Sequence, residues 1–186
     1  MKYILLYLLL ICPVYAGEDM ATWQVRDTHS SIKFSVAIEG SPAEGEFTGF
    51  SADIDFDPEM LDQARVDVRI DLNHIEAFYS DVADGLKKKD WFDVAQYPTA
   101  RFAGADFIHL GDNQYQLTGD LSLKGVTRPE ILYFTLTRYD PHRAVIKGRM
   151  TINRLDYGVG QGPWRSLSTV AGQVFLDVVI DATRKP

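Results

Sequence analysis

The sequence predicts an all-β fold, an antiparallel barrel of eight strands with one short helix. Most of the chain alternates apolar and polar residues with a period of two, which is typical of strands that bury one face. About eight such segments occur, and an antiparallel sheet with one apolar face can close into a barrel of that size. An immunoglobulin-type sandwich is the alternative, but long strands and an embedded helix count against it.

The clearest strand is expected at residues 65–72. Its apolar residues Val66, Val68, Ile70 and Leu72 alternate with arginine and aspartate, so one face is apolar and the other is charged. The same spacing predicts further strands around Ile32/Phe34/Val36/Ile38, Tyr115/Leu117/Leu121/Leu123, Leu132/Phe134/Leu136, Ala144/Ile146/Met150/Ile152 and Val174/Leu176/Val178/Ile180.

Glycine and proline mark where these strands bend or begin. Between Phe47 and Phe50 the apolar positions change parity across Gly49, which predicts a β-bulge. Pro98 and Pro129 are expected at strand starts, because that position tolerates a residue without an N–H group.

Residues 80–94 break the alternation and are expected to form the helix. Ser80 or Asp81 could cap its N-terminus, and Lys87–Lys89 would complement the helix dipole near its end. The apolar residues near helical spacing are Val82, Ala83, Leu86, Phe92 and Val94.

Residues 1–16 are expected to be a secretory signal peptide that is cleaved after Ala16. Lys2 gives the positive start, an apolar run follows, and small residues precede the cleavage site. The run is too short to cross a bilayer, which counts against an uncleaved anchor. Residues 17–186 would then form a single domain, long enough to build its own core.

The chain that remains after cleavage would be acidic and free of cysteine. It has 18 basic and 26 acidic residues, a net charge of −8, and the lone Cys12 lies in the signal. Neither a disulfide nor a thiol nucleophile is therefore expected. The acidic balance counts against nucleic acid as a partner and against broad docking on anionic lipid.

Motifs for catalysis, metals and cofactors are scarce, and we expect no enzyme. There is no Gly-x-Ser-x-Gly, and Gly158–Gly162 lacks the spacing of a dinucleotide-binding loop. The four histidines, at positions 29, 74, 109 and 142, have no neighbour at ligand spacing, so no metal site is predicted.

The apolar face of the barrel is the better candidate for function. Gly104, Gly119 and Gly148 are expected to leave places in the interior that no side chain fills. On the residues alone, a packed core and a ligand cavity both remain open, and a packed core is the commoner outcome for a barrel of this size. The phenylalanines expected to point inward are Phe34, Phe47, Phe50, Phe56, Phe102 and Phe134.

Two segments are candidates for the rim of such a cavity. Lys87–Lys89 beside Trp91 and Phe92 would offer cations to a phosphate or an acidic surface and aromatic rings to a membrane interface. The alternative is a solvated helix end beside two core aromatic residues. The loop from Gly158 to Trp164, with Arg165, is the second rim candidate.

Four ordered blocks resemble the signatures of YceI-like proteins, a periplasmic lipocalin-like family associated with polyisoprenoid lipids. The blocks are DWFDVAQYPTARF at 90–102, TGDLSLKGVTRP at 118–129, Phe47 and Phe50 with DIDFDP at 53–58, and TINRLDYG at 151–158. The resemblance runs from about Trp23 to Ile180. It implies a lipocalin-like barrel in the periplasm.

The resemblance also implies a tunnel that holds an isoprenoid lipid of the quinone or polyprenyl phosphate type, or a similar amphiphile, with no other cofactor. The protein would act as a carrier, store or sensor of that ligand. The tunnel is expected to be lined by Phe34, Val36, Phe47, Phe102, Leu121 and Phe134, with Trp91, Phe92 and Trp164 near its mouth.

One departure and one alternative accompany this resemblance. Gly85 stands directly before Leu86, where the family usually has histidine, so the preference for a head group does not carry over. The loop Gly158–Trp164 resembles a subgroup often found with membrane b-type di-haem cytochromes. A packed barrel that works by contact with such a cytochrome is the alternative function, and a homodimer formed through sheet edges is also open.

Overall fold

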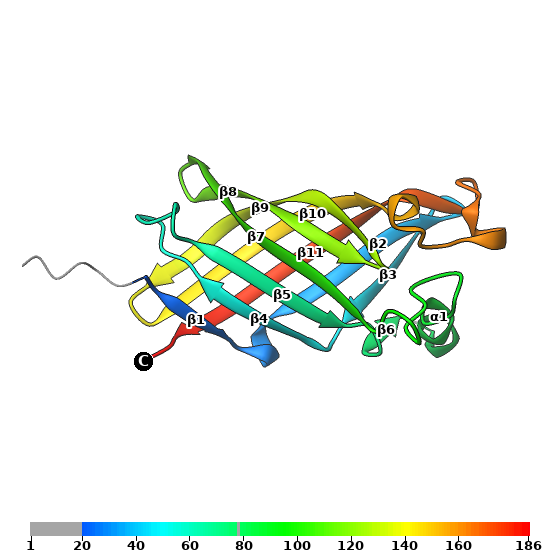
Figure 1. Ribbon diagram of the computed structural model, residues 1–186, viewed down its shortest axis with the longest axis horizontal. Coiled ribbons are helices and arrows are strands. Elements are labelled where there is room, and N and C mark those ends of the chain that lie inside the picture. The colour runs from blue at the N-terminus through cyan, green and yellow to red at the C-terminus, as the bar shows by residue number, and fades with distance from the viewer. Residues whose placement is uncertain (1–19, 78) are drawn as a thin grey trace, which may run out of the picture.

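One antiparallel sheet wraps into an elongated barrel (Figure 1). The computed structural model describes residues 20–77 and 79–186, so the expected signal peptide, residues 1–16, lies outside the described residues. The strands are β1 (Thr22–Val25), β2 (Ser31–Ile38), β3 (Ser41–Phe47), β4 (Phe50–Asp55), β5 (Arg65–Asp71), β6 (Ile75–Ala77), β7 (Thr99–Gly111), β8 (Gln114–Leu123), β9 (Val126–Asp140), β10 (Arg143–Asn153) and β11 (Val170–Arg184).

The sheet closes because β11 pairs with two strands. Its first part pairs with β2 and its last residues pair with β1, which in turn pairs with β4. The short strands β1/β2, β3/β4 and β5/β6 each share one position around the ring, so the barrel has eight positions. The predicted all-β fold, an antiparallel eight-stranded barrel with one short helix, is confirmed.

Alternation along the strands places the apolar face inside. In β8, Tyr115, Leu117, Gly119, Leu121 and Leu123 are buried, and the residues that alternate with them are exposed or half-buried. All six phenylalanines expected to point inward belong to the core or pack against it. The period of two therefore located the interior correctly.

At the position of the predicted bulge one strand ends and the next begins, and one of the two proline predictions is wrong. β3 ends at Phe47 and β4 begins at Phe50, with the Gly49 carbonyl between them accepting from the N–H of Asp71 at 2.8 Å. Pro98 directly precedes β7, but Pro129 lies inside β9. β9 pairs with β10 only from Leu132 onward, so one edge of β9 is unpaired at the proline, where a missing N–H costs little.

The helix is shorter than the expected residues 80–94. α1 covers Ser80–Leu86, and the chain then turns back, so that the N–H of Phe92 donates to the carbonyl of Leu86 at 2.9 Å. The N-cap is Tyr79, not Ser80 or Asp81. Asp93 has a φ of 51°, which helical backbone does not allow. The remaining elements are the 3-10 helices η1 (Asp27–His29), η2 (Arg154–Tyr157) and η3 (Gly162–Arg165).

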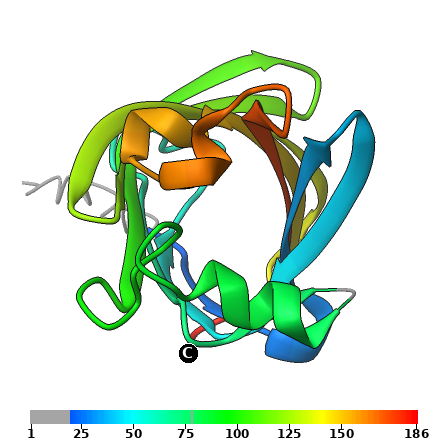
Figure 2. The same ribbon diagram turned by 90° about the vertical axis from the view of Figure 1, so that its right-hand side faces the viewer.

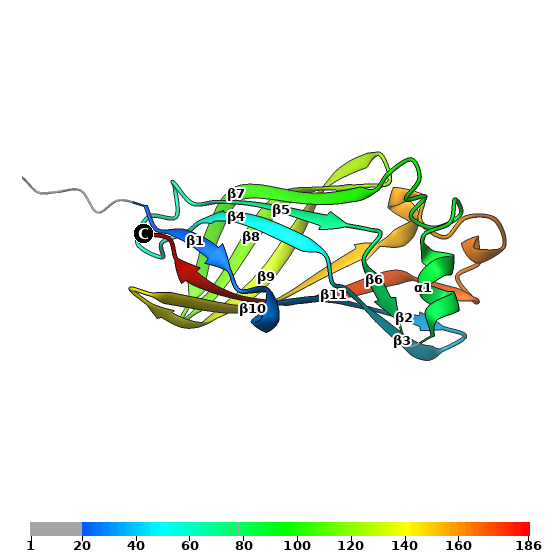
Figure 3. The same cartoon turned by 90° about the horizontal axis from the view of Figure 1, so that it is seen from below.

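The helical segments α1, η2 and η3 lie at one end of the barrel. Viewed along the long axis, α1 lies on one side of that end and η2 and η3 lie on the other (Figures 2 and 3). The opposite end is formed by hairpins and by the C-terminal residues. Within the described residues, no helix has the length and apolarity needed to cross a bilayer.

Candidate functional site: an apolar tunnel

Two cavities follow each other along the barrel axis. The inner cavity has a volume of about 140 Å³ and the outer cavity about 90 Å³. Both are lined by Ile70, Leu121 and Leu176, so they meet in the middle of the barrel. Together they form one narrow tunnel along the barrel axis.

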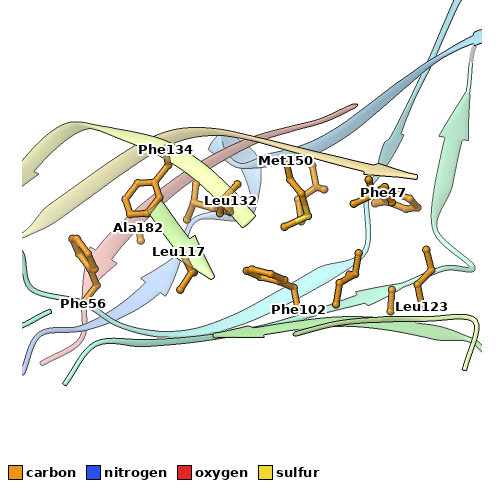
Figure 4. Close-up of a cluster of buried hydrophobic side chains, with 14 of the residues drawn as sticks. Phe47, Phe56, Phe102, Leu117, Leu123, Leu132, Phe134, Met150 and Ala182 are labelled. Atoms are coloured by element: carbon orange, nitrogen blue, oxygen red, sulfur yellow. The ribbon is translucent and has the colours of Figure 1, made fainter. Parts of the chain in front are cut away.

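The walls of the tunnel are almost entirely apolar. Every residue that lines the inner cavity has an apolar side chain except Trp23, whose indole Nε1–H donates to the carbonyl of Phe56 at 2.8 Å. The outer cavity adds one charged residue, Arg154. Figure 4 shows side chains pointing into the interior from both walls, from Phe56 at one end to Phe47 at the other.

Several inward side chains are only half-buried, which indicates a hollow interior. Val66, Val68 and Ile70 on β5, with Leu176 and Val178 on β11, line the cavities but retain partial exposure. In a packed core at the usual interior density, residues at these positions would be fully enclosed by neighbours. Partial exposure on an inward face therefore means that side chains from the opposite wall do not contact these residues.

Glycines in the wall receive aromatic rings from the neighbouring strands. A Cβ at Gly119 would lie 2.7 Å from Cζ of Phe102, and a Cβ at Gly45 would overlap the ring of Phe34. The rings thus lie against the wall, over glycine. The expectation for Gly104, Gly119 and Gly148 needs correction, because atoms of adjacent strands already occupy the space beside them.

An aromatic cluster lies at the inner end of the tunnel. Phe56 makes edge contacts with Tyr115 and Phe134 at ring-centroid distances of 5.7 and 6.1 Å, and it lies 5.5 Å from Phe107. Tyr115 stacks on Phe134 at 5.2 Å. Phe56, Tyr115 and Phe134 are all buried, so their rings pack across this end of the tunnel.

The outer end is framed by residues 79–98 and 154–170, which contact each other. The rings of Trp91 and Trp164 lie 5.7 Å apart, and the N–H of Gln161 donates to the carbonyl of Asp90 at 2.7 Å. Lys124 joins the same two segments, because its Nζ donates to the carbonyls of Lys89 and Gly158, each at 2.8 Å. Burial lowers the pKa of the Lys124 ammonium.

Arg154 organises the second of these segments from inside. Its guanidinium donates to the backbone carbonyls of Val159, Gly160, Trp164, Val170 and Ala171 at 2.7–2.9 Å. The residue is 2% exposed, and removal from water lowers the pKa of its guanidinium. All five donors of the side chain are used on backbone, so Arg154 fixes the rim of the tunnel.

The residues predicted to form the site lie mostly on the tunnel wall. Phe102 and Phe134 line the inner cavity, and Leu121 lines both cavities. Trp164 lines neither cavity; it is 41% exposed and packs on Trp91. The predicted residues that line the outer cavity are Phe34, Val36, Phe47, Leu121, Trp91 and Phe92.

Several tunnel residues escaped the sequence analysis, Arg154 foremost. Leu86 and Val159 also line the outer cavity, from the helix and from the rim. The signal for Arg154 was its place directly after the alternating strand that ends at Ile152, in the closing block of the family resemblance. No group of three or more histidine, cysteine, aspartate or glutamate side chains within residues 20–77 and 79–186 is arranged to hold a metal.

Two solved structures share this fold over most of their length. BcnA of Burkholderia cenocepacia superimposes with a TM-score of 0.82 at 30% identity, covering 86% of this chain and 99% of that chain. A polyisoprenoid binding domain from Saccharophagus degradans gives a TM-score of 0.70 at 16% identity, covering 90% of this chain and all of that one. The second likeness shows a shared fold alone.

Sequence comparison gives the family directly. A UPF0312 protein of Shewanella denitrificans is 27% identical over 182 residues, covering 95% of this chain and 93% of the relative. A UPF0312 protein of Pseudomonas savastanoi is 30% identical over 158 residues, covering 80% and 82%. The profile of the YceI-like domain matches residues 23–182, and this chain therefore belongs to the YceI-like domain family.

Proposed function

We propose that the protein binds an isoprenoid lipid, of the quinone or polyprenyl phosphate type, or a similar amphiphile, inside its tunnel. The observation that carries this proposal is the apolar interior of the barrel, where two cavities share lining residues and aromatic rings pack across one end. The structural likeness to a polyisoprenoid binding domain supports it. We assign the protein a binding role and propose no catalytic residue.

The shape of the tunnel favours one orientation of the ligand. The inner cavity has no polar group that could receive a charged or hydroxylated head, because the one indole N–H there is already bonded. The prenyl tail would therefore lie toward Phe56, with the head group at the rim near Trp91 and Arg154.

The energetics favour exchange over permanent storage. Burying each methylene-sized group from water is worth about 0.8 kcal/mol, so three isoprene units supply roughly 10 kcal/mol before the costs of association. A membrane offers the same tail a similar apolar environment, so the net preference for the protein is small. We therefore favour a carrier over a store or a sensor.

We further propose that the protein is exported to the periplasm. Residues 1–16 have the pattern of a cleavable signal. Mass determination of the protein purified from a bacterial periplasm tests this, since cleavage after Ala16 gives a chain that begins at Gly17.

Extraction of the purified protein with organic solvent, followed by mass spectrometry, is the first test of binding. We expect a prenyl lipid at a ratio close to one per chain, and its mass names the head group. Leu121→Asp places a charge where the two cavities meet and should abolish retention of lipid. An empty extract, with no uptake of added quinone or polyprenyl phosphate, would refute the proposal.

Ile131→Asp is the matched control for that variant. Ile131 is 38% exposed and lies outside both cavities, so the new charge faces water and lipid content should not change. Circular dichroism of both variants separates loss of binding from loss of fold.

The alternative of a packed barrel has less support. It requires a filled interior, whereas the described residues enclose two connected cavities. A homodimer joined through sheet edges also has less support, because β1 pairs with both β4 and β11 and closes the ring.

A further inference from the structure

Exposed apolar side chains gather at the open end of the tunnel. Val82 on α1 is 43% exposed, and Leu167, in the segment after η3, is 62% exposed. Ile38, at the end of β2, is 36% exposed and lies beside this segment, because the next N–H, from Glu39, donates to the carbonyl of Thr169 at 2.9 Å. Helix α1 and the segment that contains η3 lie on opposite sides of the end that Figure 2 shows face-on.

Exposure alone does not distinguish this end from the rest of the surface. Ile108 on β7 and Ile131 on β9 are 44% and 38% exposed on the barrel wall. The open end differs because its apolar residues stand beside the mouth of the tunnel. They stand among exposed residues of both charges, namely Lys88, Lys89 and Arg165 with Asp81, Asp84 and Asp90. Exposed apolar side chains with lysine and arginine beside them are found in proteins that bind at a membrane interface.

Charge also separates this end from the body of the barrel. Segments 79–98 and 154–170 together contain five basic and five acidic residues, so they are neutral. The other described residues contain 13 basic and 19 acidic residues. A negatively charged bilayer surface would repel the body and leave the neutral end as the part that can approach closely.

We propose that this neutral end, residues 79–98 and 154–170 with Ile38, docks on the surface of a lipid bilayer. Docking there aligns the mouth of the tunnel with the membrane, so that a lipid tail passes between them without crossing water. The inference rests on the proposed lipid-binding function for its purpose. The docking itself is a separate property that can be measured without a ligand.

Flotation with vesicles of phosphatidylcholine tests the docking. We expect the wild-type protein to float with the vesicles. The Val82→Ser/Leu167→Ser variant should bind the vesicles at least five-fold less. Both side chains point to solvent and line neither cavity, so the tunnel is unchanged. Ile108→Ser/Ile131→Ser removes a similar apolar area from the barrel wall and should change binding less than two-fold. Because the end is neutral, added salt should have little effect.

Transfer of ubiquinone separates this inference from the proposed function. The Val82→Ser/Leu167→Ser variant should take up ubiquinone from vesicles more slowly, while uptake from dilute ethanol stays at the wild-type level. Wild-type protein that binds vesicles but takes up neither ubiquinone nor a polyprenyl phosphate from either source would refute the lipid-binding function and leave the docking in place.

Two outcomes would overturn the docking proposal. One is equal vesicle binding by the two double variants, which would mean that the open end has no special role. The other is a wild-type protein that does not bind vesicles but binds a detergent-solubilised b-type cytochrome, together with a Val82→Ser/Leu167→Ser variant that does not bind the cytochrome. The surface would then serve a protein partner.

Discussion

Arg154 shows how much one residue can organise in this barrel. Five backbone carbonyls between Val159 and Ala171 accept hydrogen bonds from the guanidinium of this single buried side chain. The guanidinium thus supplies the donors that backbone N–H groups supply elsewhere. A buried carbonyl without a donor costs about 1–3 kcal/mol, so the loop depends on this residue. The ring of Trp91, 5.9 Å from the guanidinium carbon, connects the same residue to the opposite side of the rim.

We predict that Arg154→Lys lowers the free energy of unfolding by about 2–4 kcal/mol. Lysine keeps the charge but has three donors on one nitrogen, which cannot reach carbonyls spread around a planar guanidinium. Urea unfolding followed by circular dichroism measures the change. Arg165→Lys, at an exposed residue of η3, is the control and should be neutral. An unchanged midpoint for Arg154→Lys would show that the loop holds without these bonds.

Among the residues that the structure describes, Asp181 is the other buried charged residue, and it is paired. Its carboxylate accepts from Nε of Arg143 at 3.0 Å, and Arg26 lies 3.4 Å away. These two guanidinium groups, Arg143 first, hold the pKa of Asp181 below its ordinary value. A carboxyl group with a lowered folded-state pKa stabilises the fold above its unfolded pKa, about 3.9, and that contribution is lost as the pH falls through the folded pKa.

We therefore predict that Asp181→Asn is destabilised most at neutral pH. The difference in free energy of unfolding from wild type should be constant between about pH 6 and 8 and should shrink as the pH falls below about 4. Urea unfolding at a series of pH values measures this. A difference that does not change with pH would show that packing, and not charge, explains the effect of the substitution.

At the scale of elements, glycine keeps the tunnel open. A bulky ring on an inward position could extend across the barrel and fill it. However, the ring of Phe102 packs against the wall at Gly119, and the ring of Phe34 packs against it at Gly45. Glycine here acts through the space it leaves for a neighbour, and its freedom of backbone conformation is not involved.

We predict that Gly119→Ala shifts the ring of Phe102 into the lumen. The new Cβ would lie 2.7 Å from Cζ of Phe102 and 2.8 Å from the carbonyl oxygen of Ala103, so either the ring or the strand must move. Overpacking of this kind typically costs about 1–3 kcal/mol, and the narrower tunnel should retain less lipid. Gly119→Ala/Phe102→Leu should recover part of the lipid content. No recovery would mean that the clash with backbone dominates.

The strands could be predicted from the sequence, whereas the helix boundary and the glycine contacts could not. A period of two is a local signal, and it placed the inward residues of β8 correctly. The end of α1 depends on a turn in which the carbonyl of Leu86 accepts from Phe92, and side-chain spacing does not report such a backbone bond. The glycine contacts depend on register between strands, which a single strand does not encode.

At the scale of the whole molecule, the decisive property is that the barrel is hollow. A sequence lists the residues that face inward but not the distance between opposite walls, so a packed and an open interior have the same pattern. The half-buried state of Val66, Val68 and Val178 became visible only once the ring was closed. Arg154 was missed for a similar reason, because its five acceptors come together only when β11 returns beside β10.

The aromatic end of the tunnel predicts a limit on the length of the lipid tail. Ala182 lines the inner cavity near this end and is 2% exposed. A larger side chain there would fill the part of the cavity in which we place the end of the tail. We predict that Ala182→Leu weakens binding of a long-chain quinone about ten-fold, which corresponds to roughly 1.4 kcal/mol or two methylene groups no longer buried. A quinone with one or two isoprene units should bind as it does to wild type, because its tail does not reach Ala182.

A thermal unfolding curve checks that the variant keeps its fold. Equal weakening for long and short tails would contradict the orientation, because the head and not the tail would then lie at the aromatic end. A tail that enters from the side of α1 and ends against Phe56 requires the effect of Ala182→Leu to grow with chain length.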